Sequence, residues 1–366
     1  MLLRPADVGG RRKPNPIGRR YTRWMERALA EPDPARKQGK LIDRYGRTAE
    51  SLRVSVTDRC DLRCVYCMPE KGVKWLPKMN MLRVHEYERL VRLAVSMGVR
   101  SVRITGGEPL VHPRILDIVR RFRAIDGIED LAMTTNGVGL EQFARRLRDA
   151  GLDRVNVSLD TIERSGFTTI TRRDRLPEVL RGLDGAHRAG LSPVKINTVV
   201  MRGHNEKTVP DVAEMARERN YEVRFIEYMP LDAQREWELK KVVPAEDIRR
   251  RIASRWPIEP IPQAGDRAPA RLFRFADGAG TFGIIASVSE PFCRTCDRIR
   301  ISADGKIRSC LFALDETDLA ASMRKGADDD ALRAVLGRAV AAKWEGHAIQ
   351  TSRFVQPARG MSYFGG

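Results

Sequence analysis

The six cysteines of this 366-residue chain form two triplets with the close spacing of metal ligands. They are Cys60-x3-Cys64-x2-Cys67 and Cys293-x2-Cys296-x13-Cys310. An even number of cysteines is compatible with disulfides, but disulfides are typical of secreted or very small chains. Thiolates at this spacing ligate iron–sulfur clusters and zinc alike, and a structural zinc site takes four ligands. We therefore predict two metal or cluster sites. At the first, three thiolates would hold a four-iron cluster with one iron open to a small molecule, and zinc is the alternative that the spacing leaves open at both.

Basic residues give the chain a formal net charge of +18 and an isoelectric point near 10.1. Such a charge is typical of nucleic-acid-binding proteins, so a zinc-stabilised nucleic-acid-binding protein is one hypothesis. The charge is not a single patch, however, because much of it lies in residues 1–45 and on the outer faces of expected helices, such as Arg120 and Arg121. We predict solvated faces and a basic, mobile extension over residues 1–45, with other arginines attracting an anionic substrate.

From Leu52 onward, short β-branched runs alternate with amphipathic stretches, which indicates parallel strands connected by helices. The expected strands are 52–57, 101–106, 130–135, 154–160, 193–200 and 222–228, and the expected helices are 85–97, 114–125, 141–150, 177–189, 209–220 and 245–256. This alternation predicts an α/β fold, either an open doubly wound sheet or a full or partial barrel. In both folds, reactive groups gather where strands end.

The chain changes character after residue 256. Residues 257–312 hold several prolines and glycines between short strand-like runs at 271–275, 281–285, 298–302 and 306–309, which predicts an antiparallel or irregular region. A closing helix is expected over 328–343. We predict a barrel domain over 46–256 and a C-terminal domain over 257–366.

Unusual residues follow the expected strands, and together they resemble a known family. The segment Arg53-Val-Ser-Val-Thr-Asp-Arg-Cys60 leads into Cys64-Val-Tyr-Cys-Met-Pro69, and Gly106-Gly-Glu-Pro109 follows the second strand. These motifs resemble the radical S-adenosylmethionine enzymes, and the lead-in and exit of the first triplet are similar to the GTP 3′,8-cyclases of molybdenum cofactor biosynthesis. The resemblance runs from about Arg53 to the final glycines.

The resemblance implies a partial (β/α)6 TIM-type barrel, closed by a C-terminal α+β domain that carries a second iron–sulfur cluster. It implies two [4Fe-4S] clusters, with S-adenosylmethionine on the first and the guanine of GTP on the second. The implied contacts to S-adenosylmethionine are Tyr66, Gly107, Ser158 and Met229. The implied contacts to GTP are Arg53, Arg103, Thr134, Lys195, Arg298 and Arg300.

The family likeness also gives a role to the last two residues, Gly365 and Gly366, which are implied to enter the active site and act in turnover. Phe364 departs from the aliphatic residue that the family pattern places before them. The implied reaction is a lyase-type cyclisation: removal of the ribose 3′ hydrogen of GTP and attack of C3′ on C8 give 3′,8-cyclo-7,8-dihydro-GTP.

The implied partners are a one-electron donor such as flavodoxin or ferredoxin and a downstream cyclic pyranopterin monophosphate synthase. The oligomeric state is left open, with a homodimer as the candidate. No stretch approaches the roughly 18 apolar residues of a membrane helix and no secretory signal is recognisable, so we predict a cytoplasmic enzyme that binds neither membrane nor nucleic acid.

Two further hypotheses remain. One is a radical S-adenosylmethionine enzyme that modifies peptides, although such enzymes usually carry more cysteines in the C-terminal region. The other is an electron carrier, although a ferredoxin completes each cluster with a fourth cysteine.

Overall fold

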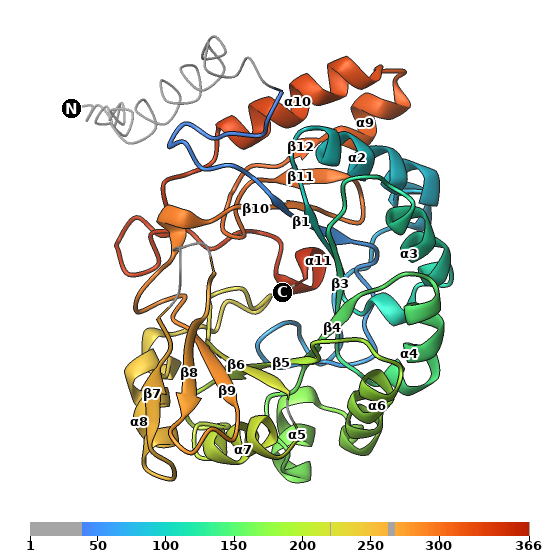
Figure 1. The fold of residues 1–366 in the computed structure, drawn as a ribbon. Helices are drawn as coiled ribbons and strands as arrows, with labels where there is room; N and C mark the ends of the chain where they lie inside the picture. The colour runs from blue at the N-terminus through green and yellow to red at the C-terminus, as the bar shows by residue number, and fades with distance from the viewer. Residues whose placement is uncertain (1–38, 220, 263–267, 366) are drawn as a thin grey trace, which may run out of the picture. The chain divides into compact units, whose positions relative to one another are not determined.

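The computed structural model describes residues 39–219, 221–262 and 268–365, and Figure 1 traces the course of the chain. Six parallel strands and their helices alternate as expected. The strands are β1 (Ser51–Ser55), β2 (Ser101–Thr105), β3 (Asp130–Thr135), β4 (Arg154–Ser158), β5 (Lys195–Val200) and β6 (Glu222–Glu227). The helices are α2 (Val84–Ser96), α3 (Ile115–Arg123), α4 (Leu140–Asp149), α5 (Arg164–Thr171), α6 (Leu176–Arg188), α7 (Val209–Arg219) and α8 (Ala245–Ala253).

These six strands pair in sequence order and form a partial barrel, which confirms the predicted fold class. Figure 1 shows α2, α3, α4 and α6 outside the arc of strands. Along β1, Leu52 and Val54 are fully buried in the core shared with the helices. Because side chains alternate along a strand, Arg53 points to the opposite side, into the barrel.

The C-terminal region supplies strands to both edges of this partial barrel. Its elements are β7 (Ile258–Pro260), β8 (Arg271–Phe275), β9 (Thr281–Ile285), β10 (Arg298–Ile301), β11 (Lys306–Arg308), β12 (Thr317–Asp318), α9 (Leu319–Arg324), α10 (Asp329–Ala341) and α11 (Met361–Phe364). The complete sheet has the order β12-β11-β10-β1-β2-β3-β4-β5-β6-β9-β8-β7. The barrel strands and the C-terminal strands therefore form one continuous sheet.

The expectation of a purely antiparallel or irregular region was wrong for two strands. Strand β9 pairs in parallel with β6, and β10 pairs in parallel with β1. On their other edges β9 and β10 pair antiparallel with β8 and β11, and β7 and β12 continue this antiparallel pairing outward. The reason is that β9 and β10 each pair with an edge strand of the barrel. This pairing bonds the N–H and C=O groups that would otherwise remain free at that edge.

The predicted extension over residues 1–45 lies mostly outside the described residues, which begin at Gly39. Its last part belongs to the folded unit: Leu41 is fully buried, its N–H donates to Met97, and Ile42 bridges Thr48. Residues 39–45 therefore lie in the described part of the chain, and the division at residue 45 stays a proposal. In the part of the chain that the structure describes, no helix is long and apolar enough to cross a bilayer.

Glu227, at the end of β6, joins the barrel to the C-terminal region. Its carboxylate is fully buried and accepts hydrogen bonds from the backbone N–H groups of Ala245, Val288 and Ser289, each at 2.7 Å. Ala245 is the first residue of α8, so a carboxylate also suits the helix dipole there. One side chain thus fixes both the start of α8 and the chain that follows β9.

We predict that Glu227→Ala lowers the free energy of unfolding by about 3 kcal/mol, because several buried donors lose their acceptor. Anaerobic urea denaturation measures this loss. Glu259→Ala is the control, because Glu259 makes an exposed ion pair with Arg274 and its loss should cost less than about 1 kcal/mol. Equal effects of the two substitutions would contradict the assigned role of Glu227.

Candidate active site

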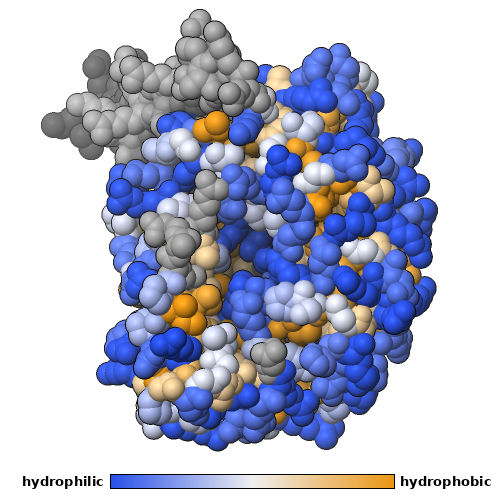
Figure 2. Space-filling view, in the orientation of Figure 1, coloured by the Kyte–Doolittle hydropathy of each residue, from blue (hydrophilic) through white to orange (hydrophobic). Residues whose placement is uncertain are grey.

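A cavity of about 350 Å³ occupies the interior of the barrel, and all six cysteines line it. Figure 2 shows a largely hydrophilic face that is hollowed near its centre. Strands β1 to β6, β9 and β10 all contribute lining side chains, as does α11 at the end of the chain. The two triplets are more than 200 positions apart in sequence, and pairing of β10 with β1 brings them to one cavity.

The first triplet lies on the loop that follows β1, and its backbone is tightly held. The N–H of Leu62 approaches the Cys60 sulfur at 3.4 Å, and Asn136 Nδ2 lies 3.8 Å from the same sulfur. Arg63 donates to the Cys60 carbonyl at 2.7 Å. Donors around a cysteine sulfur are what an iron–sulfur ligand requires.

The Gly106-Gly107-Glu108-Pro109 segment packs against this loop at backbone distance. A β-carbon on Gly107 would lie 2.3 Å from the carbonyl oxygen of Arg59, so no larger residue fits. The N–H of Gly107 donates to Thr57 and that of Glu108 donates to Arg59, both at 2.7 Å. The buried Glu108 carboxylate in turn accepts from the Asn136 N–H at 2.6 Å. The segment therefore ties the loop of the first triplet to the end of β3.

Each thiol of the first triplet is in a setting that opposes a free thiolate. Burial raises the pKa of Cys67 to about 12. Burial and Glu108 raise the pKa of Cys60, and burial and Asp160 raise that of Cys64. Burial therefore disfavours the thiolate form of these cysteines, and a bound cationic metal would offset that effect.

The donor sets fit iron–sulfur clusters. All six cysteines are free thiols and line the same cavity. Within the described residues, no three His, Cys, Asp or Glu side chains are already grouped as the ligands of a metal ion. Open sets of soft thiolates match the chemistry of a polynuclear cluster.

In the second triplet, burial raises the pKa of Cys293, as in the first triplet, but Cys296 differs in its electrostatic surroundings. Burial favours the neutral Cys296 thiol, but Lys343 and Arg298 outweigh burial and lower its pKa. The Lys343 ammonium lies 3.6 Å from the Cys296 sulfur and donates to the Cys296 carbonyl at 2.7 Å. The backbone at Gly346 also packs on Cys293, where a β-carbon would lie 3.4 Å from the sulfur.

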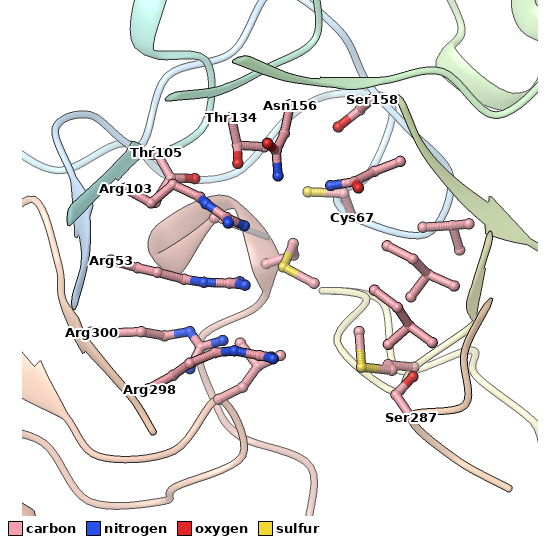
Figure 3. Close-up of a pocket in the computed structure, with 18 of the residues that line it drawn as sticks. Arg53, Cys67, Arg103, Thr105, Thr134, Asn156, Ser158, Ser287, Arg298 and Arg300 are labelled. Atoms are coloured by element: carbon pink, nitrogen blue, oxygen red, sulfur yellow. The ribbon is translucent and has the colours of Figure 1, made fainter. Parts of the chain in front are cut away.

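A row of arginines forms one wall of the cavity. Arg53 of β1 is in register with Arg300 of β10 on one side and with Arg103 of β2 on the other. Figure 3 shows these three side chains and Arg298 extending side by side into the cavity. Among the described residues, none of the four forms an ion pair with a carboxylate, and Arg300 Nε is buried without a hydrogen-bond partner. The wall is therefore cationic and uncompensated.

The pKa values reflect this crowding. Burial and the neighbouring Arg300 and Arg103 lower the pKa of Arg53. Burial, followed by neighbouring arginines, lowers the pKa of Arg103 to about 9 and that of Arg300 to about 10. Like charges side by side on a sheet repel one another, so this row stores unfavourable energy that a multiply charged anion would release.

Uncharged polar groups line the wall that adjoins the arginine row. Figure 3 shows Thr134, Asn156 and Ser158 along this wall, beyond Arg103 and Thr105. Thr134 Oγ1 and Asn156 Nδ2 are buried without a hydrogen-bond partner. Buried polar atoms rarely remain unpaired, so these atoms fit contacts to a bound molecule.

The structure gathers most of the predicted site residues in this cavity. Tyr66, Gly107, Ser158, Met229 and Gly365 line it together with the cysteines, the four arginines and Thr134. Lys195 is outside this group: its ammonium pairs with Glu222 at 2.6 Å at the start of β5. Gly366 lies outside the described residues.

Sequence reasoning missed other lining residues. They are Asn136, Asn156, Arg224, Ser287 and His347. Asn156 and Arg224 could have been found, because strict alternation along β4 and β6 places them on the same face as Ser158 and Ile226, which also line the cavity. His347, whose Nδ1 is buried without a partner, follows no strand and had no such signal.

Gly365 occupies a position that only glycine fits. Its φ of +61° is left-handed, and a β-carbon there would lie 1.7 Å from Thr105 Oγ1. Figure 1 shows α11 inside the arc of strands. The end of the chain is thus packed against the wall of the cavity at β2.

Comparisons with known proteins agree with this architecture. A family model described as "Radical SAM superfamily" matches residues 54–216, and one described as "Molybdenum Cofactor Synthesis C" matches residues 221–349. Among solved structures, Streptococcus suis SuiB bound to S-adenosylmethionine has a TM-score of 0.53 and 14% identity, and the match covers 86% of this chain and 69% of SuiB. That likeness concerns the fold alone.

Curated relatives are much more similar in sequence. "GTP 3',8-cyclase 2" of Mycobacterium tuberculosis (strain ATCC 25618 / H37Rv) is 46% identical over 355 residues, which are 96% of this chain and 99% of the relative. "GTP 3',8-cyclase" of Streptomyces coelicolor is 48% identical over 329 residues, which are 89% of this chain and 96% of the relative.

We predict that Arg53→Met relieves the repulsion in the row and weakens its affinity for polyanions. The ligand-free protein should unfold at a higher temperature, while the affinity for tripolyphosphate should fall roughly tenfold. Anaerobic thermal unfolding and calorimetric titration with tripolyphosphate measure the two effects. Arg145→Met, on the exposed face of α4, should change neither. Unaltered tripolyphosphate binding by Arg53→Met would contradict the anion site.

Proposed function

The chain belongs to the GTP 3′,8-cyclase family of radical S-adenosylmethionine enzymes, and from this premise we propose how its cavity serves that reaction. The family catalyses the first step of molybdenum cofactor biosynthesis. We propose that the substrate is GTP and the product 3′,8-cyclo-7,8-dihydro-GTP. The observation that carries the proposal is an uncompensated arginine row in the same cavity as both cysteine triplets.

Cys60, Cys64 and Cys67 would hold the [4Fe-4S] cluster that the family uses with S-adenosylmethionine. When bound, this pair supplies a 5′-deoxyadenosyl radical that removes hydrogen from the substrate ribose. Gly107 lets the backbone approach the cofactor, since its α-carbon already packs at backbone distance on the cluster loop. Tyr66, Ser158 and Met229 line the cavity beside the triplet and are the remaining proposed contacts.

Cys293, Cys296 and Cys310 would hold a second [4Fe-4S] cluster. The support is the lowered pKa of Cys296 beside Lys343, which favours the thiolate needed for ligation. An iron left open at this triplet would face the guanine of GTP. The arginine wall then lies next to it, because Arg298 and Arg300 come two and four positions after Cys296.

The GTP triphosphate would neutralise the arginine row. GTP carries about four negative charges, and Arg53, Arg103, Arg298 and Arg300 supply four cations without carboxylate partners among the described residues. Thr134 and, newly, Asn156 would bond the substrate through atoms that have no protein partner. The pairing of Lys195 with Glu222 does not favour a direct contact, so its role in GTP binding stays a prediction.

Gly365 and Gly366 are the proposed catalytic tail. Gly365 lines the cavity and packs on Thr105, and Gly366 would continue from there. With α11 in place, the tail helps to exclude water from the reacting groups.

The rest of the proposal concerns partners and location. A one-electron donor such as flavodoxin or ferredoxin would reduce the first cluster, and a cyclic pyranopterin monophosphate synthase would take the product. A homodimer is the proposed assembly. Six free thiols fit a reducing compartment, which supports the predicted cytoplasmic location. The division into a barrel over 46–256 and a C-terminal domain over 257–366 stays a proposal.

The alternatives weighed from the sequence have less support. The resemblance to the SuiB structure is at 14% identity, whereas the cyclase relatives share 46% and 48% over nearly the whole chain. A peptide-modifying enzyme and a nucleic-acid-binding zinc protein are therefore disfavoured.

We predict that the anaerobically reconstituted protein carries about eight irons per chain and converts GTP when given dithionite and S-adenosylmethionine. The triple variant Cys293→Ala, Cys296→Ala, Cys310→Ala should keep about four irons and still cleave S-adenosylmethionine, but should form no cyclised product. Iron analysis and chromatography of 5′-deoxyadenosine and GTP products measure these outcomes.

The matched control is Cys60→Ala, Cys64→Ala, Cys67→Ala, which should also lose half the iron but should release no 5′-deoxyadenosine. Zinc in place of iron, or a wild-type protein that yields no GTP-derived product, would refute the proposed function.

A further inference from the structure

The residue before the catalytic tail, Phe364, contacts a charged side chain that no sequence motif singled out. Phe364 is almost fully buried, and the Arg308 guanidinium lies 3.8 Å from the centre of its ring. This is the shortest cation-to-ring contact described in the molecule. Buried cation–π contacts of this kind stabilise substantially more than exposed ones.

Arg308 continues the line of arginines that are in register across neighbouring strands. It lies on β11 in register with Arg300 of β10, so Arg308, Arg300, Arg53 and Arg103 follow one another across four adjacent strands. Unlike the other three, Arg308 has a carboxylate partner: Glu316 pairs with it at 2.5 Å. Glu316 therefore balances the charge of Arg308, and the guanidinium of Arg308 faces the ring of Phe364 and not a bound anion.

Arg308 also touches the loop of the second triplet. Its Nη1 donates to the carbonyl of Leu311, the residue after Cys310, at 3.3 Å. The tail meets the first triplet as well, because a β-carbon on Gly360, just before α11, would lie 3.7 Å from the carbonyl oxygen of Cys67. Helix α11 thus lies beside the first triplet. It reaches the loop of the second triplet through the contact of Phe364 with Arg308.

Other contacts secure α11 as far as Tyr363, whose hydroxyl donates to the Lys74 carbonyl at 3.0 Å. Arg359 pairs with Asp304 through two hydrogen bonds, at 3.0 and 2.8 Å, and the Met361 N–H donates to Leu231 at 3.1 Å. Both precede Phe364 in the chain. The ring of Phe364 on Arg308 is the last side-chain contact before Gly365.

We propose that Arg308 is a positioning residue for the proposed cyclisation: through the ring of Phe364 it holds Gly365 in the cavity. This inference rests on the proposed function. It explains why Phe364 is compatible with a position where the family pattern has an aliphatic residue, because the ring of Phe364 makes a cation–π contact with Arg308.

The test compares Phe364→Leu with Arg308→Lys. The leucine keeps an apolar, buried side chain but removes the ring face, and the lysine keeps the charge beside Glu316 but removes the planar guanidinium. Each variant is reconstituted anaerobically and assayed with GTP, S-adenosylmethionine and dithionite. We expect the ratio of 5′-deoxyadenosine to cyclised product to rise roughly three- to tenfold in each, with iron content unchanged.

A second measurement separates positioning from general destabilisation. Hydrogen exchange of the C-terminal peptide 359–366 should accelerate in both variants, while peptides from β1 to β6 keep wild-type exchange. The double variant should resemble either single variant, because both substitutions remove the same contact. The matched controls are Phe273→Leu, in the stack of Phe273 on Phe282, and Arg274→Lys, in an exposed ion pair, and both should behave as wild type.

Wild-type ratios and wild-type exchange in both single variants would overturn the role of Arg308, as would additive effects in the double variant. These outcomes are distinct from failure of the proposed function, which would appear as a wild-type protein without GTP-derived product. If Arg308→Lys does not fold, Phe364→Leu decides the matter alone.

Discussion

The site depends on keeping several like charges side by side inside a sheet. Arg300, Arg53 and Arg103 are in register on three adjacent strands and have no carboxylate partner among the described residues. Their mutual repulsion opposes folding, and the sheet tolerates it because the other face of the same strands is a continuous apolar core, with Leu52, Val54 and Ile104 fully buried. Stability comes from one face of each strand and function from the other. A protein that binds a polyanion must pay this electrostatic cost before its ligand arrives.

The second constraint is the way in which the barrel is left open. Six β/α units leave edges at β1 and β6, and the C-terminal region covers both with parallel strands, β10 and β9. Placing β10 beside β1 brings Arg300 next to Arg53 and the second triplet to the cavity of the first. The buried Glu227 carboxylate holds the other edge by accepting from residues after β9. Edge pairing is therefore what assembles the two triplets into one site.

Much of this could be predicted from the sequence, because it is encoded locally. Thiol spacing identified both triplets, and periodicity placed the six barrel strands within a few residues of their observed bounds. What could not be predicted depends on tertiary pairing. The parallel direction of β9 and β10 follows from the barrel edges that they cover, and the partner of Lys195 follows from its register with Glu222 on β6. The packing of Phe364 on Arg308 joins residues 56 positions apart through an antiparallel hairpin and a chain end, for which no sequence pattern exists.

The charges around the two cysteine triplets differ in a way that suits two bound molecules of opposite charge. Around the first triplet, Glu108 and Asp160 act with burial to raise the pKa values of Cys60 and Cys64. Around the second, Lys343 and Arg298 outweigh burial and lower the pKa of Cys296. The sulfonium of S-adenosylmethionine is a cation and is favoured near carboxylates, whereas a nucleoside triphosphate is favoured near the arginine row. These opposite charges support the proposed order of the two molecules, with S-adenosylmethionine at the first triplet and GTP at the arginine row.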